Sequence, residues 1–157
     1  MRSPSRRCHL LTHASPDDRF LSPSAGGTQP ITVLVIEDDP LFTCLLCDLL
    51  GLEDDLEVVS VTTTIKAGVR WARRLRPHAV LTDYHLSDGT GEQAATLIKQ
   101  LLPWTRIIMM SSDVSGVARS AAERSGADAY LDKAEPINRF AELIRTVVTA
   151  EPSPALS

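Results

Sequence analysis

The sequence has few aromatic residues, few cysteines and no long apolar run. Phe, Trp and Tyr make up 4% of the 157 residues, so the core must consist mainly of Leu, Val, Ile and Ala. No stretch approaches the roughly 18 apolar residues that cross a membrane, so we predict no membrane span. Three cysteines are an odd number and do not form a disulfide framework. A reducing, cytoplasmic setting fits this composition best.

Two of the cysteines, Cys44 and Cys47, have the C-x-x-C spacing of some redox and metal sites. They lie, however, inside an apolar pattern with helical spacing, and no second cysteine pair is available to complete a zinc site. We therefore predict that both are small residues in or near the core.

The remaining composition is that of an ordinary globular protein, with 43% hydrophobic and 23% charged residues. The charge is unevenly distributed. Residues 1–30 carry four Arg against two Asp, whereas residues 31–157 carry 12 Lys and Arg against 18 Asp and Glu. The globular part is thus acidic, which gives no reason to expect that it binds nucleic acid.

The chain divides into one domain with two flanking segments. Residues 1–30 hold four prolines and many serines without sustained periodicity, which predicts a disordered N-terminal extension. Residues 31–150 form the predicted domain, and residues 151–157 form a disordered C-terminal tail.

Within this domain, short apolar runs alternate with helical patterns. The alternation predicts an α/β fold, a doubly wound five-stranded parallel sheet with five helices on its two faces. Asp39 and the threonines at 62–64 are predicted N-caps, Pro40 is a first helical residue, and Gly51 ends a helix. The predicted strands are 31–36, 56–61, 79–82, 106–111 and 129–131, and the predicted helices are 40–50, 65–75, 92–102, 114–125 and 136–149.

The predicted helix 65–75 is strongly two-sided. Its inner face is predicted to comprise Ile65, Val69, Ala72 and Leu75. Its outer face is basic, and we interpret this face as solvated helix surface; it carries Lys66, Arg70, Arg73, Arg74 and, just beyond the helix, Arg76.

Four of the predicted strands end in residues with polar chemistry: Glu37 and Asp38, Asp83, Ser111, and Lys133. The carboxyl ends of parallel strands lie on one edge of a sheet, so these side chains are predicted to converge. Three carboxylates repel one another unless a cation is present, and Mg²⁺ prefers such oxygen ligands. A lysine and a hydroxyl beside them are typical of a phosphoryl-transfer site with a carboxylate nucleophile.

In these segments the chain resembles the receiver domain of two-component response regulators over about residues 31–150. The matching stretches are residues 33–39, 81–83 with Leu86 and Gly91, 108–112, and 126–133. The resemblance implies a flavodoxin-like sheet of order 2-1-3-4-5 and a role in phosphorelay signalling. Receivers of this kind are regulatory phospho-acceptors with at most slow self-dephosphorylation, so we expect no enzyme.

The same resemblance implies a phosphorylation site. Asp83 is expected to accept a phosphoryl group from a histidine kinase or a phosphotransfer protein. Asp38, Asp83 and the backbone carbonyl of His85 are expected to hold Mg²⁺, with Glu37 acting through a bound water. Lys133 is expected to pair with the phosphoryl group.

The resemblance further implies a switch. Ser111 is expected to bind the phosphoryl group and shift on activation, and Tyr130 to follow it inward. Ser112 leaves room for the phosphoryl group. The His85 side chain either is simply exposed or affects the lifetime of that group. A downstream protein is expected to bind the face formed by the helix 114–125, the strand 129–131 and the helix 136–149, and phosphorylation could also produce a homodimer.

The chain departs from the family pattern after Lys133, where Ala134 stands in place of the usual proline. We therefore predict a trans peptide bond there. No output module follows the last helix, so we expect a single-domain receiver. Three alternatives stay open: a receiver-like module that is never phosphorylated, a phosphatase with an aspartyl nucleophile, and a fragment of a longer regulator.

Overall fold

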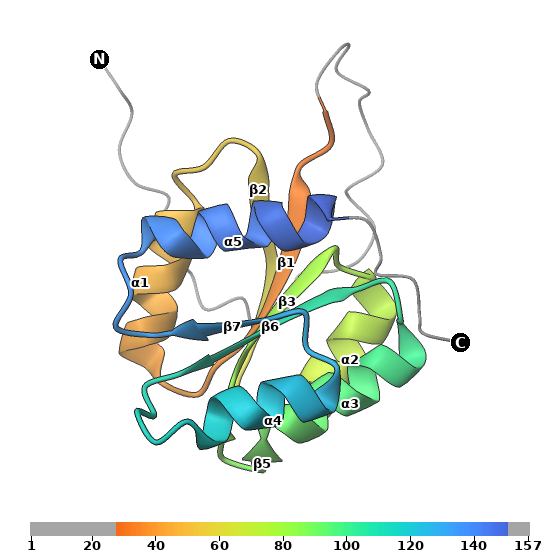
Figure 1. The fold of residues 1–157 in the computed structure, drawn as a ribbon. Helices are drawn as coiled ribbons and strands as arrows, with labels where there is room; N and C mark the ends of the chain where they lie inside the picture. The colour runs from red at the N-terminus through yellow and green to blue at the C-terminus, as the bar shows by residue number, and fades with distance from the viewer. Residues whose placement is uncertain (1–27, 151–157) are drawn as a thin grey trace.

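The computed structural model describes residues 28–150, which form a parallel sheet between two layers of helices (Figure 1). Its strand order is β2-β1-β3-β6-β7, which confirms the predicted order because β6 and β7 are the fourth and fifth sheet strands. The predicted extension and tail lie outside the described residues, apart from positions 28–30. The sheet strands are β1 (Ile31–Ile36), β2 (Leu56–Thr62), β3 (Ala79–Asp83), β6 (Arg106–Ser111) and β7 (Ala129–Asp132).

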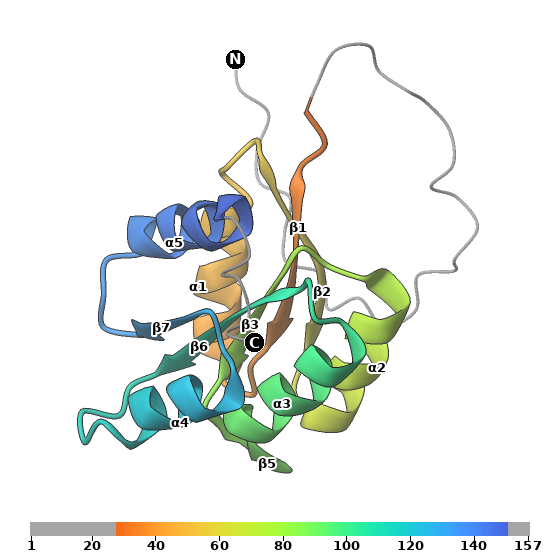
Figure 2. The same ribbon diagram turned by 45° about the vertical axis from the view of Figure 1, so that its right-hand side comes forward.

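Five helices flank this sheet, as the alternation predicts. Figure 2 shows α1 and α5 on one face and α2, α3 and α4 on the other. The turn after β3 contains a small hairpin that the sequence did not predict, formed by β4 (His85–Leu86) and β5 (Gly89–Thr90). The helices are α1 (Pro40–Leu50), α2 (Ile65–Leu75), α3 (Gly91–Leu101), α4 (Val117–Ser125) and α5 (Asn138–Thr149).

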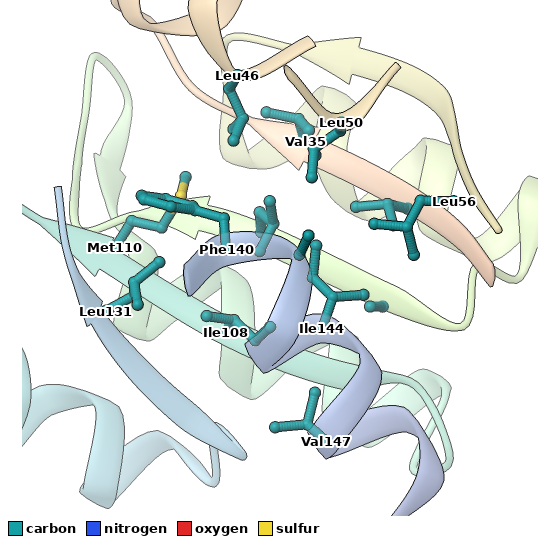
Figure 3. Close-up of a cluster of buried hydrophobic side chains, with 14 residues drawn as sticks. Val35, Leu46, Leu50, Leu56, Ile108, Met110, Leu131, Phe140, Ile144 and Val147 are labelled. Carbon is teal, nitrogen blue, oxygen red and sulfur yellow. The ribbon is translucent and has the colours of Figure 1, made fainter. Parts of the chain in front are cut away.

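The central strands are apolar on both sides, which gives the sheet two separate cores. Residues Val33 to Ile36 of β1 have no measurable exposure, as expected for a parallel strand covered on both faces. On the α1–α5 face, Leu46 and Phe140 meet side chains of the sheet (Figure 3). On the other face the core includes many alanines, which let α3 and α4 lie close to the strands. The rigid sheet fixes the positions of the strand ends.

The caps predicted from the sequence are present. The Asp39 carboxylate accepts hydrogen bonds from the backbone N–H groups of Leu41 and Phe42 at the start of α1. Thr64 caps α2, because its hydroxyl accepts a hydrogen bond from the N–H of Ala67 at 3.2 Å. These caps fix where each helix begins after its strand or loop.

Several sequence predictions need correction. Helix α4 begins at Val117, not at Val114, because Asp113 binds the backbone N–H and the hydroxyl of Ser115 and so holds a turn before the helix. Helix α5 begins at Asn138 rather than at residue 136. Cys44 is exposed, not near the core, because the buried stripe of α1 runs through Leu46 and Leu50; Cys47 is half-buried.

The backbone after Lys133 agrees with its sequence. No cis peptide bond occurs in the described part of the chain, so the predicted trans bond before Ala134 is confirmed. The Asp132 carboxylate instead holds this loop by accepting a hydrogen bond from the Ala134 N–H at 2.8 Å. None of the helices between residues 28 and 150 has the length and apolar character needed to cross a membrane.

Candidate phosphorylation site

Three carboxylates meet at the carboxyl edge of the sheet, the edge where the parallel strands end. Glu37 and Asp38 follow β1, and Asp83 ends the neighbouring strand β3. One oxygen from each of the three side chains lies within 4.8 Å of the others. The convergence predicted from the strand ends is therefore present in the structure.

Lys133, directly after β7, supplies the counter-charge. Its Nζ lies 2.6 Å from Glu37 Oε2 and 3.2 Å from Asp83 Oδ2. The same ammonium lies 4.6 Å from the ring centroid of Phe42 on α1, close enough for a cation–π interaction. One lysine thus links two carboxylates from different strands to the helix that covers them.

Glu37 is the most confined of the three acids, with 1% of its surface exposed. Burial raises the pKa of this carboxyl, while hydrogen bonds from Lys133 and from the backbone N–H of Asp39 lower the pKa less strongly. The nearby charge of Asp83 raises the Glu37 pKa further. A second positive charge beside Glu37 would therefore relieve an electrostatic cost.

The backbone around Asp83 is held by a close contact with α3. A Cβ atom on Gly91, the first residue of α3, would collide with the carbonyl oxygen of Asp83. The Gly91 N–H donates to the carbonyl of Tyr84 at 2.8 Å, and the Tyr84 N–H donates to the carbonyl of Met110. Glycine at position 91 lets the helix pack directly against the strand end that carries the carboxylate.

Ser111 ends β6 and is fully buried. Its Oγ accepts a hydrogen bond from the Asp113 N–H at 3.0 Å. Hydrogen bonds from Ser115 keep the pKa of the Asp113 carboxyl below its usual range. A hydroxyl can accept and donate at the same time, so this bond does not prevent Ser111 from donating to a phosphoryl oxygen. The buried side chain would have to turn toward the cleft to do so.

Tyr130, on β7 beside Ser111, is half-buried, and this burial raises the pKa of its hydroxyl. The hydroxyl donates to the Asp113 carbonyl at 3.5 Å. The guanidinium of Arg119 on α4 lies 4.6 Å from the centre of the Tyr130 ring. Movement of this ring would thus break contacts with both α4 and the loop before it.

A cleft of about 370 Å³ opens beside these groups and is lined by Asp83, His85, Ser112, Asp113 and Lys133. The His85 side chain is exposed, and its ring meets the Tyr84 ring edge-on at 4.7 Å. Because the exposed ring also borders the cleft, this position fits both alternatives for His85: a simply exposed side chain, and one that affects the lifetime of the phosphoryl group. Ser112, expected to leave room for the phosphoryl group, is exposed and lines this cleft.

The three acids fit a hard divalent cation. Oxygen donors, converging charge and a buried carboxylate are what Mg²⁺ sites offer. The trio is the one such cluster found within residues 28–150.

Several contacts at the site were not predicted from the sequence. Phe42 and Arg119 gave no signal, because an aromatic residue or an arginine with helical spacing indicates only core or surface. Gly91 was part of the resemblance, but its role as a close-packing position was not recognised. The hydrogen-bond partner of Ser111, the Asp113 N–H, depends on loop geometry that no pattern encodes.

The fold and this site define the class of protein. Residues 33–145 match the family model described as "Response regulator receiver domain", and the chain belongs to this family. Members of the family accept a phosphoryl group on an aspartate, bind Mg²⁺ in the acidic pocket, and interact with histidine kinases or phosphotransfer proteins.

One relative of known sequence is the response regulator protein VraR of Staphylococcus epidermidis. It is 28% identical over 121 residues, which are 77% of this chain and 58% of VraR. The matched residues thus span a little over half the length of VraR.

Two of the solved structures that are similar to this chain illustrate the fold. The response regulator domain of Thermotoga maritima CheB superposes with a TM-score of 0.72 at 25% identity, covering 79% of this chain and all of that domain. The receiver domain of a sensor histidine kinase from Pseudomonas aeruginosa, whose structure has a magnesium ion in its active-site cleft, has a TM-score of 0.70 at 20% identity. That match covers 77% of this chain and 99% of the other and supports the fold alone.

Proposed function

We propose that Asp83 is the phospho-accepting residue of this receiver and that its phosphorylation changes which proteins the chain binds. The observation that supports this most directly is the placement of Lys133, within 3.2 Å of Asp83 and 2.6 Å of Glu37. That arrangement puts a nucleophilic carboxylate, further oxygen ligands and a fixed cation around one open cleft.

The reaction follows from these positions. An Asp83 carboxylate oxygen attacks the phosphorus of a phosphohistidine; a P–O bond forms, the P–N bond breaks, and the histidine nitrogen keeps the electron pair. Glu37, Asp38, Asp83 and the His85 carbonyl are the groups we assign to Mg²⁺, with Glu37 acting through water. When bound, the ion would neutralise charge on the phosphoryl oxygens. The Lys133 ammonium pairs with one of those oxygens.

The switch begins at Ser111. To donate its hydroxyl hydrogen to a phosphoryl oxygen, Ser111 must turn toward the cleft, because its side chain is fully buried and does not line the cleft. Such movement frees space beside Tyr130, whose ring can then leave Arg119 and turn inward. Hydrolysis restores the unphosphorylated state. Water attacks phosphorus, the P–O bond to Asp83 breaks, and inorganic phosphate leaves.

The face we assign to output is formed by α4, β7 and α5. Val114, just before α4, is 94% exposed and Val117 is 52% exposed, so apolar side chains are already available there. Tyr130 borders the same face. We expect a downstream protein, or a second copy of the chain, to bind this face. A cytoplasmic location remains our expectation and rests on the family.

One experiment tests the central claim. The protein is incubated with Mg²⁺ and acetyl phosphate, and a phosphate-binding gel separates modified from unmodified chain. We expect a shifted band that disappears in Asp83→Asn and in EDTA but persists in Asp48→Asn, a matched change on the exposed side of α1. No shift, or an equal shift in Asp83→Asn, contradicts the proposal. Rapid release of phosphate would instead favour the phosphatase alternative.

A further inference from the structure

A cluster of arginines and tryptophans lies at the opposite end of the sheet from Asp83. It combines the last turns of α2 with the loop between α3 and β6. We call it the basic patch, and it consists of Arg70, Trp71, Arg73, Arg74, Arg76 and Trp104. Figure 2 shows α2 and α3 side by side, with the end of α2 leading into the start of β3. The patch therefore lies at the amino edge of the sheet, where the strands begin.

The two parts of the patch are joined by defined contacts. The Arg76 guanidinium lies 5.9 Å from the centre of the Trp104 ring. The Thr105 hydroxyl donates to the Pro77 carbonyl at 3.0 Å, and the Arg106 N–H donates to the His78 carbonyl at 2.9 Å. These bonds fix the loop of Trp104 against the segment after α2, so the patch is a preformed surface.

The arginines of the patch lack the partners that other arginines have. Elsewhere in residues 28–150, four of the five arginines form an ion pair with a carboxylate: Arg106, Arg124, Arg139 and Arg145. The fifth, Arg119, lies over the ring of Tyr130. No described carboxylate lies within ion-pair distance of the four patch arginines. Their spacing along α2 also brings like charges together, which weakens a helix.

Structural roles account for only part of the patch. Cations in the last turn of a helix interact favourably with its dipole, which explains Arg73 and Arg74. It does not explain Trp104, whose surface is 58% exposed. It also does not explain Arg76, which ends α2 with φ 48° and ψ 56°, the left-handed region that favours glycine. A strained arginine held over an exposed tryptophan indicates a binding role.

We infer that the basic patch is a docking surface for an acidic segment of a partner protein. Its carboxylates would bind the unpaired guanidinium groups, and an apolar side chain would cover Trp104. Arginine and tryptophan are the residues that most often dominate the energy of protein interfaces. The partially exposed Leu75 and Leu101 extend the apolar area beside them. This role is independent of Asp83 and goes beyond the proposed phosphorylation.

The charge of the rest of the domain favours a peptide over a nucleic acid. Residues 31–157 carry 12 Lys and Arg against 18 Asp and Glu, and the four patch arginines are among the 12. The surface outside the patch is thus strongly acidic and repels an extended polyphosphate. A short acidic segment can contact the patch without crossing that surface.

The test uses the full chain and a short fluorescein-labelled peptide of alternating Glu and Leu, with binding followed by fluorescence anisotropy. We expect binding that weakens by about tenfold or more in Arg73→Glu, Trp104→Ala and Arg76→Gly. Arg139→Glu makes the same charge change on α5 and should leave the affinity unchanged. Circular dichroism checks that each variant is folded.

Other outcomes overturn the inference. No binding by the wild-type chain, or an equal loss in Arg139→Glu, means that the patch is not a docking surface for acidic peptides. A single-stranded oligothymidylate and phosphatidylserine vesicles are the competing probes. Tighter, patch-dependent binding of either one would assign the surface to nucleic acid or membrane instead.

Discussion

The two edges of the sheet differ in the sign and the burial of their unbalanced charge. At the carboxyl edge, Glu37 and Asp83 are buried and share one lysine. At the amino edge, the basic patch leaves four arginines exposed and without a described carboxylate partner. Unbalanced charge is costly in the interior and nearly free in water. The excess negative charge buried at the carboxyl edge therefore requires a cation. The excess positive charge at the amino edge is exposed to water and does not require a bound partner.

Removing Lys133 should have the largest effect, because it leaves two confined carboxylates without their cation. In EDTA we expect Lys133→Met to lower the free energy of unfolding by about 3–5 kcal/mol, the usual cost of breaking a buried ion pair. Urea unfolding followed by circular dichroism measures this loss. Phosphorylation by acetyl phosphate should also fall sharply.

The matched control is Arg76→Met at the amino edge, which removes a cation that is exposed. Its urea midpoint should change little. Equal losses of stability in Lys133→Met and Arg76→Met would show that buried and exposed charges at the two edges do not differ in their energetic cost.

Binding of Mg²⁺ should have the next largest effect. At about a hundredfold excess over the dissociation constant, a ligand of the folded state alone adds about 2.7 kcal/mol of stability. Burial raises the pKa of Glu37 in the folded protein above its ordinary value of 4.5. Without metal, the contribution of Glu37 to the free energy of unfolding therefore falls as the pH rises from 4.5 through the folded-state pKa. Mg²⁺ binds the charged form, so its stabilising effect should grow over the same pH range.

Thermal melts with Mg²⁺ and with EDTA at a series of pH values check this dependence. In Glu37→Gln the carboxyl is gone, so the Mg²⁺-dependent difference should be smaller and should lose most of its pH dependence. A wild-type difference that stays constant with pH would show that Glu37 does not take part.

Gly91→Ala should have a moderate effect on both stability and chemistry. The added methyl group collides with the Asp83 carbonyl, and overpacking of this kind costs about 1–3 kcal/mol. Movement of the backbone would also shift the Asp83 carboxylate away from Lys133, so phosphorylation should slow. Gly51→Ala, at the end of α1 with an ordinary helical φ of −70°, also brings a methyl group close to a carbonyl oxygen, that of Cys47, and is the control for this kind of contact. Slower phosphorylation in both variants would mean that the effect is not specific to Asp83.

The same contrast explains what could be predicted from the sequence. Each acid of the candidate site lies at the end of an apolar strand, so the sequence alone predicts Asp83 and Glu37 at one edge of the sheet. The sequence predicts the basic outer face of α2, but not its contact with Trp104, because Arg76 and Trp104 are far apart in sequence and meet only through packing. Leu75 is predicted on the inner face of α2 but is 36% exposed, because it is the last residue of the helix and the chain turns away after it.

Arg76→Gly should have the smallest effect on stability and the most informative one. Glycine adopts the left-handed conformation without the Cβ penalty, which at such sites is about 1–2 kcal/mol, but the variant also loses the contact with Trp104 and gains chain entropy when unfolded. We therefore expect a net gain of about 0.5 kcal/mol in the free energy of unfolding, measured as a higher urea midpoint.

If folding stability were the sole role of residue 76, glycine would serve it better than arginine. A more stable variant that binds the Glu–Leu peptide less tightly would show that Arg76 is held in a strained conformation for binding. A variant that is both less stable and unchanged in affinity would make Arg76 a structural residue and reduce the amino edge to ordinary surface.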